Sequence, residues 1–105
     1  MIKIKIKNKG FYYPEKILRN PREQELGYQF LTKNDIEPNS CLLFIFPKEE
    51  QGRIFHMENC NSFDIQLYAL DANKKLVDAV RMSKGSKNKY SINGACMYVI
   101  EVPVL

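Results

Sequence analysis

Residue types that build metal and catalytic centres are scarce in this sequence of 105 residues. It has no tryptophan, one histidine, His56, and three cysteines, Cys41, Cys60 and Cys96. No CxxC pair is present and one cysteine stays unpaired in any disulfide scheme, so we expect reduced thiols rather than a zinc ribbon or a disulfide framework. Because the single histidine lies in no catalytic motif, the sequence predicts no metal site, no cofactor and no catalytic residues.

Long apolar segments are missing too. The longest strictly apolar run, at 41–46, has six residues, whereas a membrane-spanning helix needs about 20. Residues 2–7 alternate between apolar and basic side chains, unlike the unbroken apolar stretch of a signal peptide. We therefore expect a cytoplasmic protein that crosses no membrane. A virion is the other location considered, since the 31 Lys, Ile and Asn residues have AT-rich codons, as in many bacteriophage genomes.

Acidic side chains are sparse in two segments of a chain that has 16 basic and 12 acidic residues and a net charge of +4. Residues 1–22 hold seven basic side chains and one acidic one, and residues 81–89 hold four basic and no acidic ones. Aromatic residues are interleaved with both segments, as in grooves that bind single-stranded nucleic acid. On a shared face the two segments would bind polyanions, with the candidate residues Lys3, Lys5, Lys7, Arg81, Lys84, Lys87 and Lys89. The alternative is that these charges only keep a small protein soluble.

Hydrophobic patterning predicts a mainly β domain with a minor α component. The length is that of a single domain, 1–105, in which an N-terminal strand segment, 1–19, precedes a core, 20–103. Alternating Ile and Lys at 2–7 predict a strand with one wet face, and six further segments have strand character, at 11–13, 41–46, 53–57, 65–70, 75–82 and 97–102. The segment at 41–46 is expected at the sheet centre, with Pro14 and Pro103 interrupting or ending their strands. The expected fold is a small β-sandwich or partly closed barrel of six to seven strands with one short helix.

One segment has the signals of a helix start. Asn20 is a favoured N-cap, and a proline follows it at the first helical position. The helix is predicted over residues 21–30, with Leu26 and Phe30 facing the core because they are four residues apart. Gly27 either weakens this helix or lets another group approach closely.

A series of segments is similar to one known family. These are the capped segment at 20–24, Gly-Tyr-Gln-Phe at 27–30, Cys-Leu-Leu-Phe-Ile-Phe-Pro at 41–47, Phe-His-Met-Glu-Asn-Cys at 55–60, and Tyr-Val-Ile-Glu-Val-Pro at 98–103. In this order they resemble the uncharacterised family called domain of unknown function 192, over roughly 17–103. The resemblance implies a small mixed β fold with a capped helix, and no established activity. His56, Glu58 and Cys60 stand where the family has Trp, Lys and Thr.

The segment at 53–59 is the best candidate for a ligand or partner surface. It combines apolar side chains with polar groups of several kinds, as binding pockets do. The candidate residues are Arg53, Phe55, His56, Glu58 and Asn59. The alternative is a strand with one wet face.

We therefore predict a non-catalytic binding or interaction module that recognises a small ligand or a protein partner through 53–59. One alternative is a structural or accessory component of an assembly such as a phage particle, so an oligomer is possible. Another is nucleic-acid binding through segments 1–22 and 81–89. An enzyme is the least favoured class, because His56 and Cys60, four residues apart on a predicted strand, would lie roughly 13 Å apart.

Overall fold

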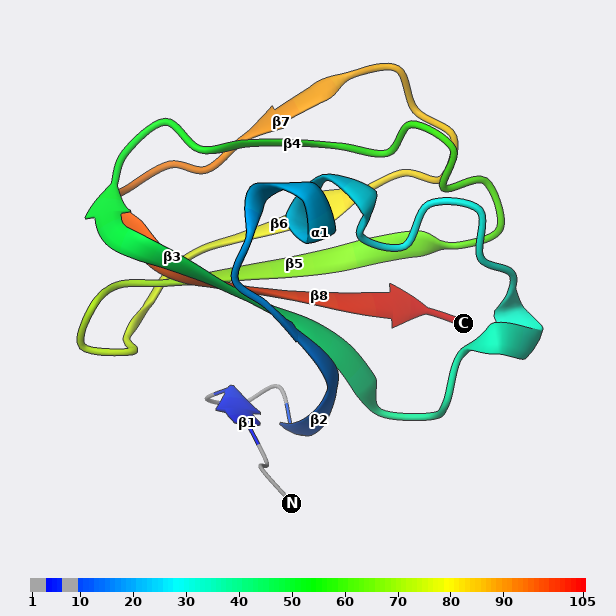
Figure 1. The fold of residues 1–105 in the computed structure, drawn as a ribbon, viewed down its shortest axis with the longest axis horizontal. Helices are drawn as coiled ribbons and strands as arrows, with labels where there is room; N and C mark the ends of the chain where they lie inside the picture. The colour runs from blue at the N-terminus through cyan, green and yellow to red at the C-terminus, as the bar shows by residue number, and fades with distance from the viewer. Residues whose placement is uncertain (1–3, 7–9) are drawn as a thin grey trace.

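The computed structural model describes residues 4–6 and 10–105. Within these ranges the chain forms strands, one α-helix and one 3₁₀ turn (Figure 1). In chain order they are β1 (Ile4–Ile6), β2 (Gly10–Leu18), α1 (Pro21–Leu26), the 3₁₀ turn Lys33–Asp35, β3 (Ser40–Glu50), β4 (Ile54–His56), β5 (Asp64–Leu70), β6 (Leu76–Met82), β7 (Lys89–Ser91) and β8 (Cys96–Val104). No helix in the described ranges is long and apolar enough to span a bilayer.

Six of the strands form one curled sheet, a half-barrel. Its order is β1-β2-β3-β8-β5-β6, and β4 pairs with β7 in a separate two-stranded ribbon. Neighbours in the large sheet are antiparallel except for β2 and β3, which are parallel because α1 lies in the connection between them. Figure 1 shows α1 in front of the sheet and the β4–β7 ribbon above it. The predicted mainly β, partly closed fold with one short helix is confirmed.

Each face of the large sheet buries a separate set of apolar side chains. On β8, Val99 belongs to the larger core and Ile100 to the smaller one, because successive strand residues point to opposite faces. The larger core also contains Phe44 of β3 and Met57 after β4. The smaller core lies beneath β1 and contains Ile6. As predicted, the run at 41–46 lies in a central strand, although β3 continues to Glu50.

The helix is shorter than predicted, and its predicted inward face is wrong. Gly27 ends α1 with φ 46° and ψ −125°, and its N–H donates to the carbonyl of Glu23. Left-handed φ of this kind favours glycine and breaks the helical repeat. Consequently Leu26 and Phe30 are 54% and 72% exposed, and Tyr28 is the side chain that enters the core.

The strand assignments need three further corrections. β7 lies in the segment between 82 and 97 for which no strand was predicted, which brings the strands in the described ranges to eight rather than six to seven. Pro14 lies inside β2, beside a register shift in its pairing with β3. Pro103 lies inside β8, opposite Ile65, and does not end that strand. A bulge accommodates the proline of β2, which has no N–H to donate to the ladder.

The N-cap of α1 provides a test of how the helix is held. Asn20 Oδ1 accepts from the N–H of Glu23 at 2.8 Å, and Asn20 Nδ2 donates to the Glu23 carboxylate at 2.6 Å. We expect Asn20→Ala to lower the free energy of unfolding by about 1 kcal/mol, and Asn20→Ser to lower it much less, because serine also caps. Urea denaturation monitored by circular dichroism measures both. Equal losses in the two variants would contradict the role of the cap.

Candidate functional site

A cavity of about 270 Å³ lies between two walls. One wall consists of α1 and the residues that follow it, and the other is the segment that contains β4. We call this cavity the α1–β4 pocket. Gln24, Glu25 and Tyr28 line one side, and Phe55 and Met57 line the other. The large sheet supplies its floor through β3, β5 and β8, with the residues Phe44, Phe46, Ile65 and Glu101. Gln24 holds the helix side in place, because its Nε2 donates to the carbonyls of Leu18 and Ile45 at 3.0 and 3.1 Å.

Four of the five candidate residues in 53–59 line this pocket. They are Arg53, Phe55, His56 and Glu58. Asn59 lies beside the pocket and joins the two walls: its Nδ2 donates to Gln29 Oε1 at 3.4 Å, and its carbonyl accepts from the N–H of Phe30 at 2.8 Å. The sequence therefore identified a segment that the fold gathers around one cavity.

Arg53 is a fixed part of the pocket wall. Its Nε donates to the carbonyl of Cys96 at 3.2 Å and one terminal nitrogen donates to the carbonyl of Lys48 at 2.7 Å. The other terminal nitrogen lies 3.7 Å from the Glu50 carboxylate, and the guanidinium carbon lies 3.6 Å from the centre of the Phe46 ring. A guanidinium stacked and hydrogen-bonded in this way shapes the wall, and much of its donor capacity is already used.

His56 connects the two walls at the pocket mouth. The N–H of Glu58 donates to His56 Nδ1 at 3.2 Å, so this nitrogen is the acceptor and Nε2 carries the proton in the neutral ring. His56 Nε2 lies 3.4 Å from Glu25 Oε1 on α1. The contact spans the gap between helix and strand, which suits a rim residue.

Glu101 is the site residue that sequence reasoning missed. It lies on β8 between Leu42 of β3 and Leu67 of β5, and is only 5% exposed. Burial raises the pKa of its carboxyl group from 4.5 to about 8. The sequence signal is a single acid, Glu101, in the otherwise apolar segment at 96–104, where it forms part of the family motif.

Gly27 allows the main chain to approach this carboxyl group. A Cβ atom on Gly27 would lie 3.5 Å from Glu101 Oε1 and 4.0 Å from the Phe44 ring. Both alternatives predicted for Gly27 are therefore confirmed: it ends the helix, and it lets the main chain approach Glu101 closely.

Tyr28 places a second polar group deep in the same region. Its side chain is 2% exposed, its ring packs edge-on against Phe63 at 5.7 Å, and its hydroxyl has no hydrogen-bond partner among residues 4–6 and 10–105. Burial raises the pKa of the hydroxyl strongly, and the buried Cys41 and Glu101 raise it further. The hydroxyl is therefore a neutral donor at any physiological pH.

The three thiols are buried and protonated. Burial raises the pKa of Cys41 to about 12 and that of Cys60 to about 11, and it raises the pKa of Cys96 as well. The Cys60 thiol faces the carbonyl of Phe63 at 3.9 Å. In the part of the chain that the structure describes, no three His, Cys, Asp or Glu side chains converge to hold a metal ion.

The basic candidates are spread over separate elements. Lys5, Arg81, Lys84, Lys87 and Lys89 are all exposed, whereas Lys3 and Lys7 lie outside the described residues. β1 and β7 lie at opposite ends of the molecule in Figure 1, so Lys5 and Lys89 are far apart.

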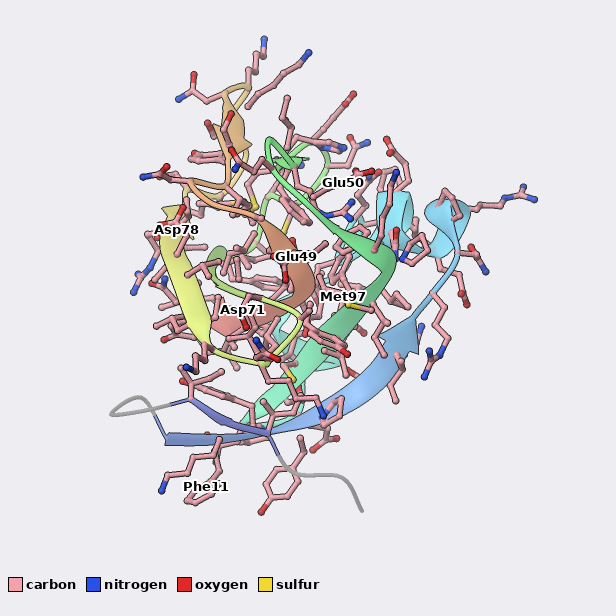
Figure 2. All side chains as sticks on the ribbon, turned by 90° about the vertical axis from the view of Figure 1, so that its left-hand side faces the viewer. Phe11, Glu49, Glu50, Asp71, Asp78 and Met97 are labelled. Atoms are coloured by element: carbon pink, nitrogen blue, oxygen red, sulfur yellow. The ribbon has the colours of Figure 1, made fainter. Side chains whose placement is uncertain are left out.

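The face turned to the viewer in Figure 2 is partly acidic. It carries Glu49, Glu50, Asp71 and Asp78, and Phe11 lies at its lower end. Lys5 Nζ lies 5.7 Å from the centre of the Phe11 ring. A polyanion reaching from β1 to β7 over this face would meet like charges.

Comparison with known proteins identifies a family and a fold. The model of the DUF192 family, described as "Uncharacterized ACR", matches residues 4–104. The resemblance inferred from the segments at 17–103 is thus confirmed and reaches the N-terminal strand. No curated protein matches the chain.

Two solved structures are similar to this one. A "putative transcription regulator" from Sinorhizobium meliloti has a TM-score of 0.78 and 15% identity, over 89% of this chain and 69% of that chain. A protein of unknown function from Novosphingobium aromaticivorans has a TM-score of 0.75 and 14% identity, over 90% of this chain and 66% of that chain. At such identities the likeness shows a common fold and nothing more.

Proposed function

The chain belongs to the DUF192 family of uncharacterised proteins, and we propose that it is a non-catalytic binding module that holds a small ligand in the α1–β4 pocket. The observation that carries this proposal is a buried carboxyl group, that of Glu101, at the floor of a cavity with aromatic walls. Apolar pockets with one or a few convergent polar groups are typical of small-molecule sites. The volume, about 270 Å³, lies just below the usual range of such sites and suits a small ligand.

The rim supports a ligand that extends out of the cavity. Leu26 and Ile54 line the pocket and are 54% and 58% exposed, and Phe30 is exposed nearby. Phe30 has a φ of 66°, and its N–H donates a hydrogen bond to the carbonyl of Asn59, which has a φ of 60°. Left-handed backbone at a bulky residue costs free energy and often marks a functional site. The exposed apolar side chains form a surface at the rim. The apolar part of a ligand, or of a protein segment, can contact this surface.

Native mass spectrometry of the protein purified from cells tests the proposal. We expect a peak above the 12.3 kDa chain mass by the mass of a small molecule. The added mass should fall several-fold in a double His56→Ala and Asn59→Ala variant, which loses both side-chain contacts across the mouth. Lys75→Ala, an exposed change in the β5–β6 turn, is the matched control and should keep the ligand.

Other outcomes of the same measurement are decisive. Multiples of the chain mass without an added ligand would favour the alternative of an assembly component. If the double variant and Lys75→Ala keep equal amounts of ligand, the ligand is bound elsewhere and the proposal fails.

A further inference from the structure

Two polar side chains at the pocket are almost completely buried and lack partners. The Glu101 carboxyl group takes part in none of the side-chain hydrogen bonds and ion pairs between described residues, although its main chain pairs with β3 and β5 in the sheet. Tyr28 Oη is a fully buried hydroxyl without a hydrogen-bond partner in the described ranges. They are 5% and 2% exposed. Buried polar groups in folded proteins nearly always have a partner, so an unpartnered pair beside a cavity points to a ligand group that supplies one.

The charge state of Glu101 decides which ligand group fits. Tyr28 and Cys60, which line the same pocket, are neutral, and Arg53, the one Lys or Arg side chain among the described lining residues, is held by two carbonyls and by Glu50. An isolated carboxylate in such a place would carry a large desolvation cost, so the group is the neutral acid. The remaining titratable groups among the described lining residues are His56, Glu25 and Glu58, which are half-buried or exposed, unlike Glu101.

We propose that the α1–β4 pocket selects an uncharged ligand whose carbonyl oxygen accepts a hydrogen bond from the carboxyl O–H of Glu101. This inference rests on the proposed function and names its ligand class. A neutral carboxyl group is both a donor and an acceptor. An amide offers a carbonyl oxygen and an adjacent N–H. A ligand with an amide therefore matches both the donor O–H and the acceptor oxygen of the Glu101 carboxyl group.

The surroundings oppose charged alternatives. An ammonium group would require Glu101 to give up its proton, and the guanidinium of Arg53 already lies in the wall. A ligand carboxylate would itself have to be desolvated among Phe44, Phe46 and Phe55, where an unpaired charge is costly. An uncharged carbonyl group avoids both costs.

Three matched aromatic probes test the inference: benzamide, benzylamine and benzoate. Binding is measured by amide chemical shifts in ¹H–¹⁵N NMR spectra, observed at pocket residues such as Gly27, Phe55 and Met57. We expect benzamide to bind more tightly than the other two. Glu101→Leu should weaken benzamide by about 3- to 10-fold, the value of one net hydrogen bond, and Glu101→Gln should preserve most of the affinity because its carboxamide also donates and accepts.

The pH dependence of benzamide binding gives a second test, which begins with the unsubstituted chain. Between pH 7 and pH 9 the neutral fraction of a carboxyl group with a pKa of about 8 falls about tenfold, and benzamide affinity should fall with it. Repeating the series in His56→Ala removes any contribution from the ring at the rim. Glu101→Gln should lose this dependence.

The possible results separate the inference from the proposed function. Shifts confined to pocket residues support a small-molecule site whichever probe causes them. Tighter binding of benzylamine, increasing with pH, would assign a cationic ligand and overturn the inference. If the affinity for benzamide changes neither with pH nor in Glu101→Leu, the inference is also overturned, but the pocket remains a binding site. If none of the three probes shifts pocket resonances at its solubility limit, both proposals fail.

Discussion

Replacing Glu101 with glutamine is expected to stabilise the protein by about 5 kcal/mol above pH 8 while leaving its stability nearly unchanged at pH 4. The carboxyl pKa is raised in the folded chain from 4.5 to about 8 by burial. At low pH the group is neutral in both folded and unfolded chains, and glutamine, of similar shape, costs little. As pH rises, the unfolded chain loses this proton first, and the folded chain is destabilised until its own carboxyl group titrates.

The sign of the effect follows from the direction of the shift. A pKa raised by folding gives a contribution to stability that is complete below pH 4.5 and is lost as pH rises to about 8. The loss amounts to roughly 1.4 kcal/mol per pH unit within that window. Glutamine does not titrate, so the difference between the two proteins should widen across the window and then stay constant.

Urea denaturation between pH 4 and pH 9 measures this difference. Glu58→Gln is the matched control, because its side chain is an exposed glutamate of the same pocket. Its unfolding free energy should follow that of the unsubstituted chain within about 0.5 kcal/mol, as surface changes generally do. Parallel curves for Glu101→Gln and the unsubstituted chain would show that the carboxyl group reaches water in the folded protein, contrary to the burial observed.

Residue types and spacing were sufficient to predict the sheet and one wall of the pocket. The apolar run at 41–46 predicts a central strand because only a strand covered on both faces accommodates such a segment. Polar and aromatic side chains mixed at 53–59 predicted a ligand surface, and four of the five candidates line the cavity. Both predictions depend on short-range pattern, which the fold preserves.

The opposite wall and the floor could not be predicted in this way. Helical spacing assigned Leu26 and Phe30 to the core, but the left-handed turn at Gly27 directs Tyr28 inward instead. The burial of Glu101 depends on β3, β5 and the Gly27 turn, segments distant in the sequence that meet only in the folded sheet. A local pattern can indicate that one acid interrupts an apolar strand, but it cannot show what covers that acid.

Gly27→Ala is expected to affect stability and binding together. Its φ of 46° and ψ of −125° form a conformation that side chains rarely adopt, so alanine should cost about 1–3 kcal/mol of unfolding free energy. The added methyl group would lie 3.5 Å from Glu101 Oε1. This is an ordinary contact rather than a clash, so the chain should fold, with the space beside the carboxyl group filled. Benzamide binding followed by NMR should therefore weaken at least as much as in Glu101→Leu.

Gly52→Ala separates the two effects. Gly52 also has a left-handed φ, of 75°, but a Cβ atom there would meet nothing within 4 Å, and it lies outside the pocket. It should lower the urea midpoint much as Gly27→Ala does, because both changes strain the backbone. It should leave benzamide affinity unchanged, because no atom is added beside Glu101. If both variants lose binding equally, the loss at Gly27 reflects general destabilisation. If Gly27→Ala retains full affinity, the ligand does not occupy the space beside Glu101 Oε1 in which the methyl group would lie.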